Sequence, residues 1–262
     1  MAKIIAVTNQ KGGVGKTTTS VNLAASLALT QKRVLLIDLD PQGNATMGSN
    51  INKHELETSV LDVLLAEEEI KDCIHKIDAI GFDVLPSNSD LTAAEVELLS
   101  VDGRESRLRS ALTQVEGDYD FIIIDCPPSL NMLTVNALVS ANGVLIPMQC
   151  EYYALEGLSS LIETIDQVKS SVNPSLEIEG LLRTMYDPRN KLAMDVSEQL
   201  LEHFGDRVYR TVVPRNVRLA EAPSHGLPVL NYDKTSRGAL AYFSLAGEVI
   251  RKQVKAAHPA VA

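Results

Sequence analysis

The chain alternates short runs of apolar residues with longer amphipathic stretches. Residues 4–8 and 34–39 are mainly apolar, and between them residues 17–30 carry apolar side chains at helical spacing. Continuous apolar runs are typical of strands buried on both faces of a parallel sheet. The pattern therefore predicts a strand, a helix and a second, parallel strand at the start of the chain.

The same alternation continues along the sequence. It predicts further strands at 82–85, 121–124, 143–148, 178–182 and 208–213, and helices near 92–100, 104–115, 131–141, 155–170, 192–204 and 237–253. Strands that alternate with helices predict an α/β fold, with a doubly wound, mostly parallel sheet flanked by helices. The sequence has no Gly/Ser/Pro-rich linker and no repeat, so we expect one domain over residues 1–255 and a disordered tail over 256–262.

Composition is that of an ordinary globular domain, with 45% hydrophobic and 22% charged residues among 262. No apolar run approaches the roughly 20 residues of a membrane helix, and the first ten residues lack the apolar core of a signal peptide. Cys73, Cys126 and Cys150 form no CxxC pair. We therefore expect a cytoplasmic protein whose cysteines are reduced and buried, without a disulfide or a cysteine metal centre.

Charge is distributed unevenly along the chain. The formal net charge is −10, yet residues 1–182 hold 12 Lys and Arg against 26 Asp and Glu, whereas residues 183–262 hold 12 against 8. The last third is consistent with a basic patch that meets a polyanion, and equally with an unevenly charged, solvated surface. Charge counting alone leaves both interpretations open.

A glycine-rich string, KGGVGKTT at residues 11–18, follows the first predicted strand. Glycines let the backbone turn so that successive N–H groups converge on phosphate oxygens, and the next helix points its positive N-terminus at the same anion. Lys16 is placed to neutralise the β and γ phosphates, and the Thr17 hydroxyl to ligate Mg²⁺. A glycine-rich turn without a ligand is the alternative, but the two lysines and the strand–loop–helix context disfavour it. The predicted nucleotide-binding residues are Lys11, Gly12, Gly13, Val14, Gly15, Lys16, Thr17 and Thr18.

Acidic residues end two of the predicted strands. Asp38 and Asp40 lie in the string DLDPQGN, and Asp125 follows the run at 121–124. The carboxyl ends of parallel strands face the ligand crevice, where a carboxylate can approach Mg²⁺ or a water molecule. A carboxylate that only caps the turn before Pro41 is the alternative, more for Asp38 than for Asp40.

The loop departs from the common GxxxxGK[ST] pattern, because Gln10 stands where the first glycine is expected and Lys11 follows it. It resembles the deviant Walker A motif of the ParA/MinD superfamily of P-loop ATPases. The strings NQKGGVGKTTT, LLIDLDPQGNAT, DCPPSLNMLTVNAL and RTVVPRNVRLAEAPSHGLPV are similar to chromosomal ParA (Soj) proteins, and the resemblance extends over nearly the whole chain. It implies an ATPase that uses ATP and Mg²⁺.

The resemblance also implies roles for single residues. Lys11 would reach across a nucleotide-sandwich dimer to the partner's phosphates, although a lysine that only raises the local positive potential is the alternative. Asp40, in the segment similar to switch I, would position or deprotonate the attacking water. We accordingly predict catalytic roles for Lys11, Lys16 and Asp40, and magnesium contacts for Thr17, Asp40 and, through water, Asp125. Pro214 and Asn216 are predicted to contact the base, although a simple turn at Pro214 fits equally well.

The implied biology is chromosome (or plasmid) partition at the nucleoid. ATP would close a homodimer that binds double-stranded DNA without sequence preference, and a ParB-like partner would stimulate hydrolysis. The candidate DNA contacts are Arg189, Arg218 and Arg237, with Lys191, Arg215 and Lys234 behind them. The alternative is a MinD-like or cargo-positioning ATPase, but residues 251–257 offer little large apolar surface, so we expect no membrane contact.

Overall fold

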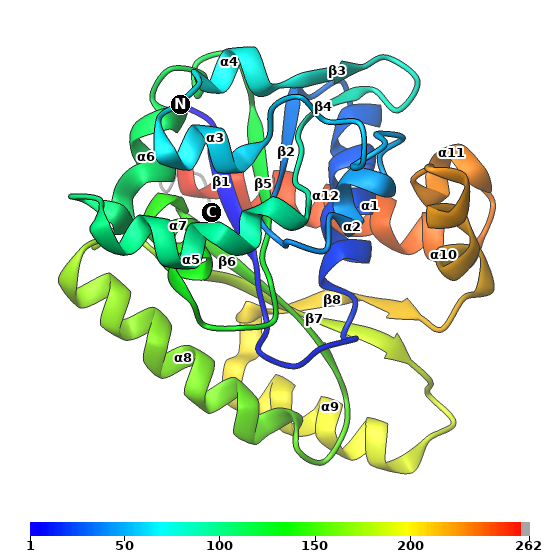
Figure 1. The fold of residues 1–262 in the computed structure, drawn as a ribbon. Coiled ribbons are helices and arrows are strands. Elements are labelled where there is room, and N and C mark those ends of the chain that lie inside the picture. Colours follow the sequence, from blue (N-terminus) through cyan, green and yellow to red (C-terminus); the bar gives the residue numbers. More distant parts are fainter. Residues whose placement is uncertain (258–262) are drawn as a thin grey trace.

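Eight strands form one sheet in the computed structural model, which describes residues 1–257 (Figure 1). The strand order is β3-β4-β2-β5-β1-β6-β7-β8, and every neighbouring pair is parallel except the antiparallel pair β3 and β4. The strands are β1 (Lys3–Val7), β2 (Val34–Asp38), β3 (His75–Ile77), β4 (Phe82–Leu85), β5 (Phe121–Asp125), β6 (Gly143–Gln149), β7 (Glu177–Tyr186) and β8 (Val208–Pro214). The predicted doubly wound, mostly parallel sheet is confirmed.

Helices cover both faces of this sheet (Figure 1). Those packed on one face are α3 (Val60–Leu65), α4 (Ile70–Cys73), α5 (Ala94–Glu97), α6 (Arg107–Leu112), α7 (Met132–Ser140), α8 (Ala154–Ser171) and α9 (Lys191–Phe204). Those packed on the other face are α1 (Lys16–Leu29), α2 (Asn44–Met47), α10 (Val217–Glu221), α11 (Val229–Tyr232) and α12 (Arg237–Ala257).

The alternation of side chains along each strand supplies two separate hydrophobic cores. In β1, Ile4 and Ala6 belong to the core under α7, whereas Ile5 and Val7 belong to the core under α1 and α12. Successive side chains of a strand point to opposite faces, so a strand covered on both faces must be apolar throughout. This is why the strands appear as continuous apolar runs in the sequence.

Two predicted helices were wrong in extent. The segment 92–100 divides into a 3₁₀ turn at Ser89–Ala93, the short α5 and a second 3₁₀ turn at Leu98–Ser100, and the segment 104–115 forms an α-helix only over α6. Both segments begin at a local capping feature, the Asn88 side chain in the first and the left-handed Gly103 in the second. Leu91 and Leu98 are nevertheless fully buried. The spacing of apolar residues therefore predicted which side chains are buried, but not how long the helices are.

Strand β3 was missed because its three residues form a polar hairpin edge with no apolar run. At the other end of the chain, α12 continues to Ala257, two residues into the predicted tail, and residues 258–262 lie outside the described residues. Within the described part, no helix combines the length and apolar character needed to cross a bilayer. The three cysteines are free and buried, as predicted.

Candidate active site

The predicted phosphate loop connects β1 to α1 at the carboxyl edge of the sheet. Gly13 and Gly15 have positive φ angles of 73° and 89°, a conformation that costs glycine little and other residues more. A Cβ atom at Gly12 or Gly13 would meet no heavy atom within 4 Å, so the loop faces open space. Helix α1 begins after Gly15 without a side-chain cap, which leaves its first N–H groups available to an anion.

The outward carbonyl groups of the loop are held by side chains from elsewhere in the chain. Gln149 at the end of β6 donates to the Gly13 carbonyl at 3.0 Å, and Thr184 of β7 donates to the Val14 carbonyl at 2.8 Å. A loop whose carbonyl oxygens are fixed on one side presents its N–H groups on the other. The tertiary contacts therefore preorganise the loop for phosphate.

Two lysines with different surroundings belong to this loop. The Lys16 side chain is buried and its ammonium donates to the Lys11 carbonyl at 3.2 Å. Burial lowers the pKa of Lys16, and the nearby carboxylates of Asp125 and Asp40 oppose that shift. The Lys11 side chain, by contrast, is 44% exposed and forms an ion pair with Glu151. Lys16 is thus enclosed within the site, whereas Lys11 lies at its rim.

Asp125, at the end of β5, is fully buried beside the loop. Its Oδ1 accepts a hydrogen bond from the Ser20 hydroxyl at 2.8 Å, and its Oδ2 has no hydrogen-bond partner in the described structure. Burial raises the pKa of Asp125 to about 8, the Asp38 carboxylate adds to the rise, and the Thr17 and Ser20 hydroxyls oppose it. An orphaned buried carboxylate oxygen requires a cationic or hydrogen-bonding ligand.

The carboxylates after β2 have different partners. Asp38 accepts hydrogen bonds from the Thr46 backbone and hydroxyl, both at 2.8 Å, and from the Asp40 backbone at 3.1 Å. The turn-capping interpretation therefore holds for Asp38, whose pKa burial raises to about 6. Asp40 is 8% exposed, and its Oδ1 accepts a hydrogen bond from the Gln42 backbone at 2.9 Å. Among residues 1–257 its Oδ2 accepts none of the hydrogen bonds found, which leaves this oxygen available for a water molecule.

Next to the phosphate loop lies a mainly apolar hollow of about 390 Å³. Gly15 and Thr18 line it on the side of the loop, and Pro214 and Asn216 line it on the opposite side. The predicted base contacts are therefore brought to the loop, although the Asn216 side chain also caps α10 through the Arg218 backbone at 2.9 Å. Met185 lines the same hollow with a positive φ of 49°, a strained conformation of the kind that gathers at ligand sites.

These features fit a nucleotide accompanied by Mg²⁺. Within the described residues, no group of three or more His, Cys, Asp or Glu side chains is arranged to hold a metal alone. Magnesium in nucleotide sites takes few protein ligands and completes its shell with phosphates and waters. The open loop, the Thr17 hydroxyl and the orphaned Asp125 Oδ2 supply the protein part of such a site.

The basic residues predicted to contact DNA lie on loops and helix starts around β7, β8, α10 and α12. Arg189 donates to both oxygens of Asp187, at 2.9 and 2.8 Å, and Arg218 pairs with Glu221 at 2.8 Å and Asp233 at 3.3 Å. Arg237 is exposed and forms no ion pair with any residue between 1 and 257. Hydrogen bonds from Arg189 lower the pKa of Asp187, and the charge of Arg215 adds a smaller effect, so the loops after β7 and β8 carry their charges close together.

Sequence reasoning missed the residues that support the site. These are Ser20 beneath Asp125, Thr46 on Asp38, Gln149 and Thr184 on the loop carbonyls, and Glu151 on Lys11. No spacing rule links partners more than 100 residues apart, as Ser20 and Asp125 are. The pairing of Arg218 with Glu221, however, has the helical i, i+3 spacing and was visible in the sequence.

Residues 2–178 match the family described as "AAA domain". The chain is 55% identical to the "Sporulation initiation inhibitor protein Soj" of Bacillus subtilis, over 95% of this chain and 98% of that protein. It is 50% identical to the "Chromosome partitioning protein ParA" of Myxococcus xanthus, over 96% of this chain and 89% of that protein. It also superposes with a TM-score of 0.86 and 38% identity on a Mycobacterium smegmatis structure named cobyrinic acid a,c-diamide synthase, solved with ADP and magnesium, over 98% of this chain and 97% of that one.

Proposed function

The chain belongs to the ParA/Soj family of chromosome-partitioning ATPases, and from this premise we propose the residues through which it binds ATP, dimerises and holds DNA. It is an ATPase that uses ATP and Mg²⁺. The observation that carries the residue assignment is the buried cluster of Lys16, Asp40 and Asp125 beside an open glycine loop. Burying charged side chains with so few hydrogen-bond partners is costly, and it is not expected of a purely structural site.

The phosphates are received by the loop N–H groups of residues 11–18, by the N-terminus of α1 and by the Lys16 ammonium. Thr17, Asp40 and, through water, Asp125 would hold the magnesium ion. When bound, Mg²⁺ would neutralise the charge that develops on the transferred phosphoryl group. Because Ser20 occupies one oxygen of Asp125, the other oxygen would be the one available to a water molecule of the ion. The hollow between Thr18 and Pro214 receives the base, with Asn216 at its edge.

Asp40 orients the attacking water. Its side chain is fixed at one oxygen by the Gln42 backbone, and Ser87 holds its carbonyl group at 3.0 Å. The second carboxylate oxygen can therefore accept a hydrogen bond from a water molecule and take its proton as the water oxygen bonds to the terminal phosphorus. The bond from that phosphorus to the bridging oxygen breaks, and ADP leaves. Nearby Lys16 stabilises the negative charge of the phosphates during this step.

The rim of the site is the surface where a second copy docks. Lys11 must release Glu151 to reach the phosphates of that copy, and an exposed ion pair costs at most about 1 kcal/mol to break. Next to Glu151, Tyr152 and Tyr153 are 74% and 72% exposed, and Leu130 in the loop after β5 is 41% exposed. Exposed aromatic side chains next to a lysine that can extend to a second copy suit an interface that forms only when nucleotide is bound.

DNA is bound through Arg189, Arg218 and Arg237, supported by Lys191, Arg215 and Lys234. These side chains can meet phosphates, and nothing in their arrangement requires contact with a particular base. Dimerisation would place two such surfaces together, which raises the number of phosphates contacted. In this proposal a ParB-like protein stimulates hydrolysis and releases the dimer from the nucleoid.

The decisive experiment uses Asp40→Ala, which removes the water-orienting carboxylate and leaves Lys16 and Thr17 in place. We expect ATP binding to persist while turnover falls by about a hundredfold or more, so that a dimer accumulates on DNA. Affinity is measured for two unrelated duplexes with ATP and with ADP, and Asp102→Ala, in an exposed loop, serves as the control. Equal affinity with ATP and ADP, or strong preference for one duplex, would contradict the proposal. ATP-dependent binding to anionic liposomes instead would favour a MinD-like function.

A further inference from the structure

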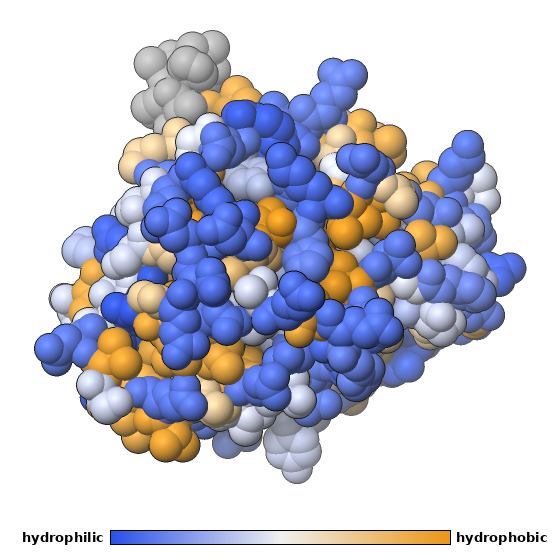
Figure 2. Space-filling model, turned by 45° about the horizontal axis from the view of Figure 1, so that its top comes forward, coloured by the Kyte–Doolittle hydropathy of each residue, from blue (hydrophilic) through white to orange (hydrophobic). Residues whose placement is uncertain are grey.

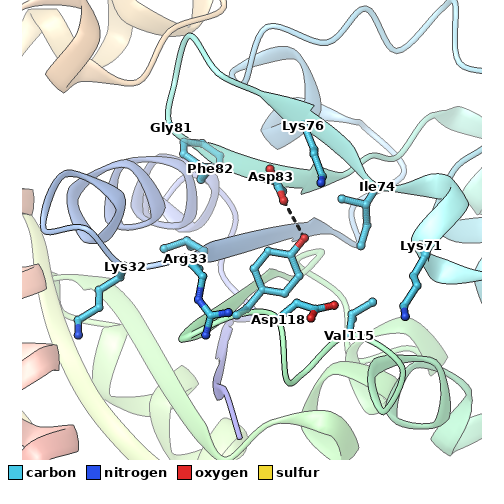
Figure 3. Close-up of a pocket in the computed structure, with 12 residues that line it drawn as sticks. Lys32, Arg33, Lys71, Ile74, Lys76, Gly81, Phe82, Asp83, Val115 and Asp118 are labelled. Atoms are coloured by element: carbon cyan, nitrogen blue, oxygen red, sulfur yellow. Dashed lines mark hydrogen bonds between the residues drawn. The ribbon is translucent and has the colours of Figure 1, made fainter.

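A second hollow lies at the edge of the sheet opposite to the phosphate loop. It has a volume of about 490 Å³ and is formed by the amino ends of β2 and β4, by α4 and β3, and by the turn before β5 (Figure 3). This volume is within the range of small-molecule sites, which is roughly 300–1,000 Å³. Because it lies at the amino rather than the carboxyl ends of the strands, the hollow is separate from the ATP site.

Positive charge converges on this hollow. Lys32, Arg33, Lys71 and Lys76 line it, and they come from three separate segments of the chain. They are four of only 12 Lys and Arg residues in a region, 1–182, that also carries 26 Asp and Glu. Figure 3 shows Lys71 and Lys76 on one side of the hollow and Arg33 across from them.

Most of these cations have no acidic partner. Of the four, Arg33 alone takes part in an ion pair found among residues 1–257, with Asp120 at 3.4 Å. Two carboxylates, Asp83 and Asp118, line the hollow beside the four cations, so the lining keeps a net positive charge. A concave surface with an excess of positive charge concentrates anions. The hollow therefore favours an anionic ligand.

The floor of the hollow combines apolar and acidic side chains. Tyr119 and Ile74 line it together with Asp83 and Asp118, whereas the Phe82 side chain is buried in the core on the α1 face of the sheet. The Tyr119 hydroxyl donates to Asp83 Oδ2 at 2.8 Å, which fixes both the ring and the carboxylate (Figure 3). Figure 2, with this end of the molecule turned toward the viewer, shows hydrophobic residues visible between hydrophilic ones. A site with a cationic rim, one aromatic ring and two carboxylates suits a ligand with an anionic end and a planar body that bears N–H or O–H groups.

We propose that this hollow is a binding site for a small organic phosphate of nucleotide size. The phosphate would lie between Lys71 and Lys76 with Arg33 opposite, since lysine binds phosphate as a point charge. The body of the ligand would rest against the ring of Tyr119, and its donors would face Asp83 and Asp118. A duplex is a less suitable occupant, because its phosphates lie on a convex surface that does not enter a hollow of this size.

The test uses the full chain with its ATP site saturated by ADP and Mg²⁺, so that a second ligand is detected separately. GMP and inorganic phosphate are titrated in parallel by calorimetry. We expect saturable binding of GMP, at least about tenfold tighter than that of phosphate because the Tyr119 ring and the carboxylates contact the body of the nucleotide. Lys71→Glu/Lys76→Glu should weaken GMP binding by about tenfold or more, and Lys169→Glu/Lys255→Glu, with the same change in net charge, should leave it unchanged.

The neutral pair Lys71→Gln/Lys76→Gln provides the same test should the charge reversal disturb folding, and circular dichroism checks each variant. No saturable GMP binding, equal affinity for GMP and phosphate, or binding that survives both double variants would overturn the proposal. Loss of DNA affinity in the lysine variants without any GMP binding would also overturn it, in favour of an additional contact to nucleic acid. None of these results depends on how the ATP site works.

Discussion

Ser20 of α1 donates its hydroxyl proton to Asp125 Oδ1 at 2.8 Å in the interior of the protein. The two residues are 105 positions apart, and the bond connects the helix that begins at the phosphate loop to the end of β5. It occupies one oxygen of a buried carboxylate and leaves the other without a hydrogen-bond partner among residues 1–257. The serine thereby determines which carboxylate oxygen stays unpartnered beside the phosphate loop.

We predict that Ser20→Ala lowers stability by about 1–3 kcal/mol and weakens MgATP binding. The variant removes the hydroxyl that donates to Asp125 Oδ1, and the cost of an unsatisfied buried acceptor is of that order. Urea unfolding and fluorescent-nucleotide titration measure the two effects. Ser26→Ala is the matched control, because its buried hydroxyl donates only to the Asn22 carbonyl of the same helix. Equal nucleotide affinity in the two variants would show that Ser20 does not position Asp125.

Lys16→Ala should abolish useful ATP binding while the chain stays folded. The ammonium is desolvated, and the one hydrogen-bond acceptor found for it among residues 1–257 is the Lys11 carbonyl, so its removal costs the fold little. For the nucleotide, losing a buried cation costs about 3 kcal/mol, or roughly a hundredfold in affinity. Equilibrium binding of labelled ATP measures this loss, with the exposed Lys169→Ala as control. Near wild-type affinity would refute the assignment of the loop.

The raised pKa of Asp125 predicts a pH dependence of stability in the nucleotide-free, magnesium-free protein. A carboxyl group whose pKa rises from 3.8 to about 8 on folding binds more protons in the folded than in the unfolded state between these values. Stability therefore falls as pH rises from about 4 to about 8. Asp125→Asn keeps an acceptor for Ser20 but does not titrate, so its unfolding free energy should decline less over that window. Parallel curves for the two proteins would contradict the prediction.

Asp187→Asn should strengthen DNA binding. Asp187 holds Arg189 in a bidentate pair, and this acidic partner reduces the charge that Arg189 offers to a phosphate. Freeing the arginine should steepen the dependence of log affinity on log salt by about one phosphate contact. Affinity for a duplex at several salt concentrations, in the Asp40→Ala background with ATP, measures the effect. Asp102→Asn has the same charge change in an exposed loop between α5 and α6, and an equal gain there would attribute the effect to net charge alone.

Much of the fold was predictable because its signals are local. The parallel sheet follows from apolar runs such as 121–124, since a strand covered on both faces has apolar residues at nearly every position. The phosphate loop was predictable for a similar reason, because left-handed turns at Gly13 and Gly15 restrict residue choice within a few positions. The polar hairpin edge β3 had no apolar run to reveal it. The apolar spacing of the segment 92–100 was misleading, because it indicated one continuous helix.

The sequence by itself determined which groups stand at the carboxyl edge of the sheet: the glycine loop, Lys16, Asp40 and Asp125. The tertiary structure alone decided their state. It buried Lys16 and Asp125, bound Asp38 to Thr46, left Asp125 Oδ2 free, and brought cations from three segments around the opposite hollow. The reason is physical: a residue's identity and local spacing are written in the chain, but its burial, pKa and hydrogen-bond partners depend on residues that only folding brings within a few ångströms.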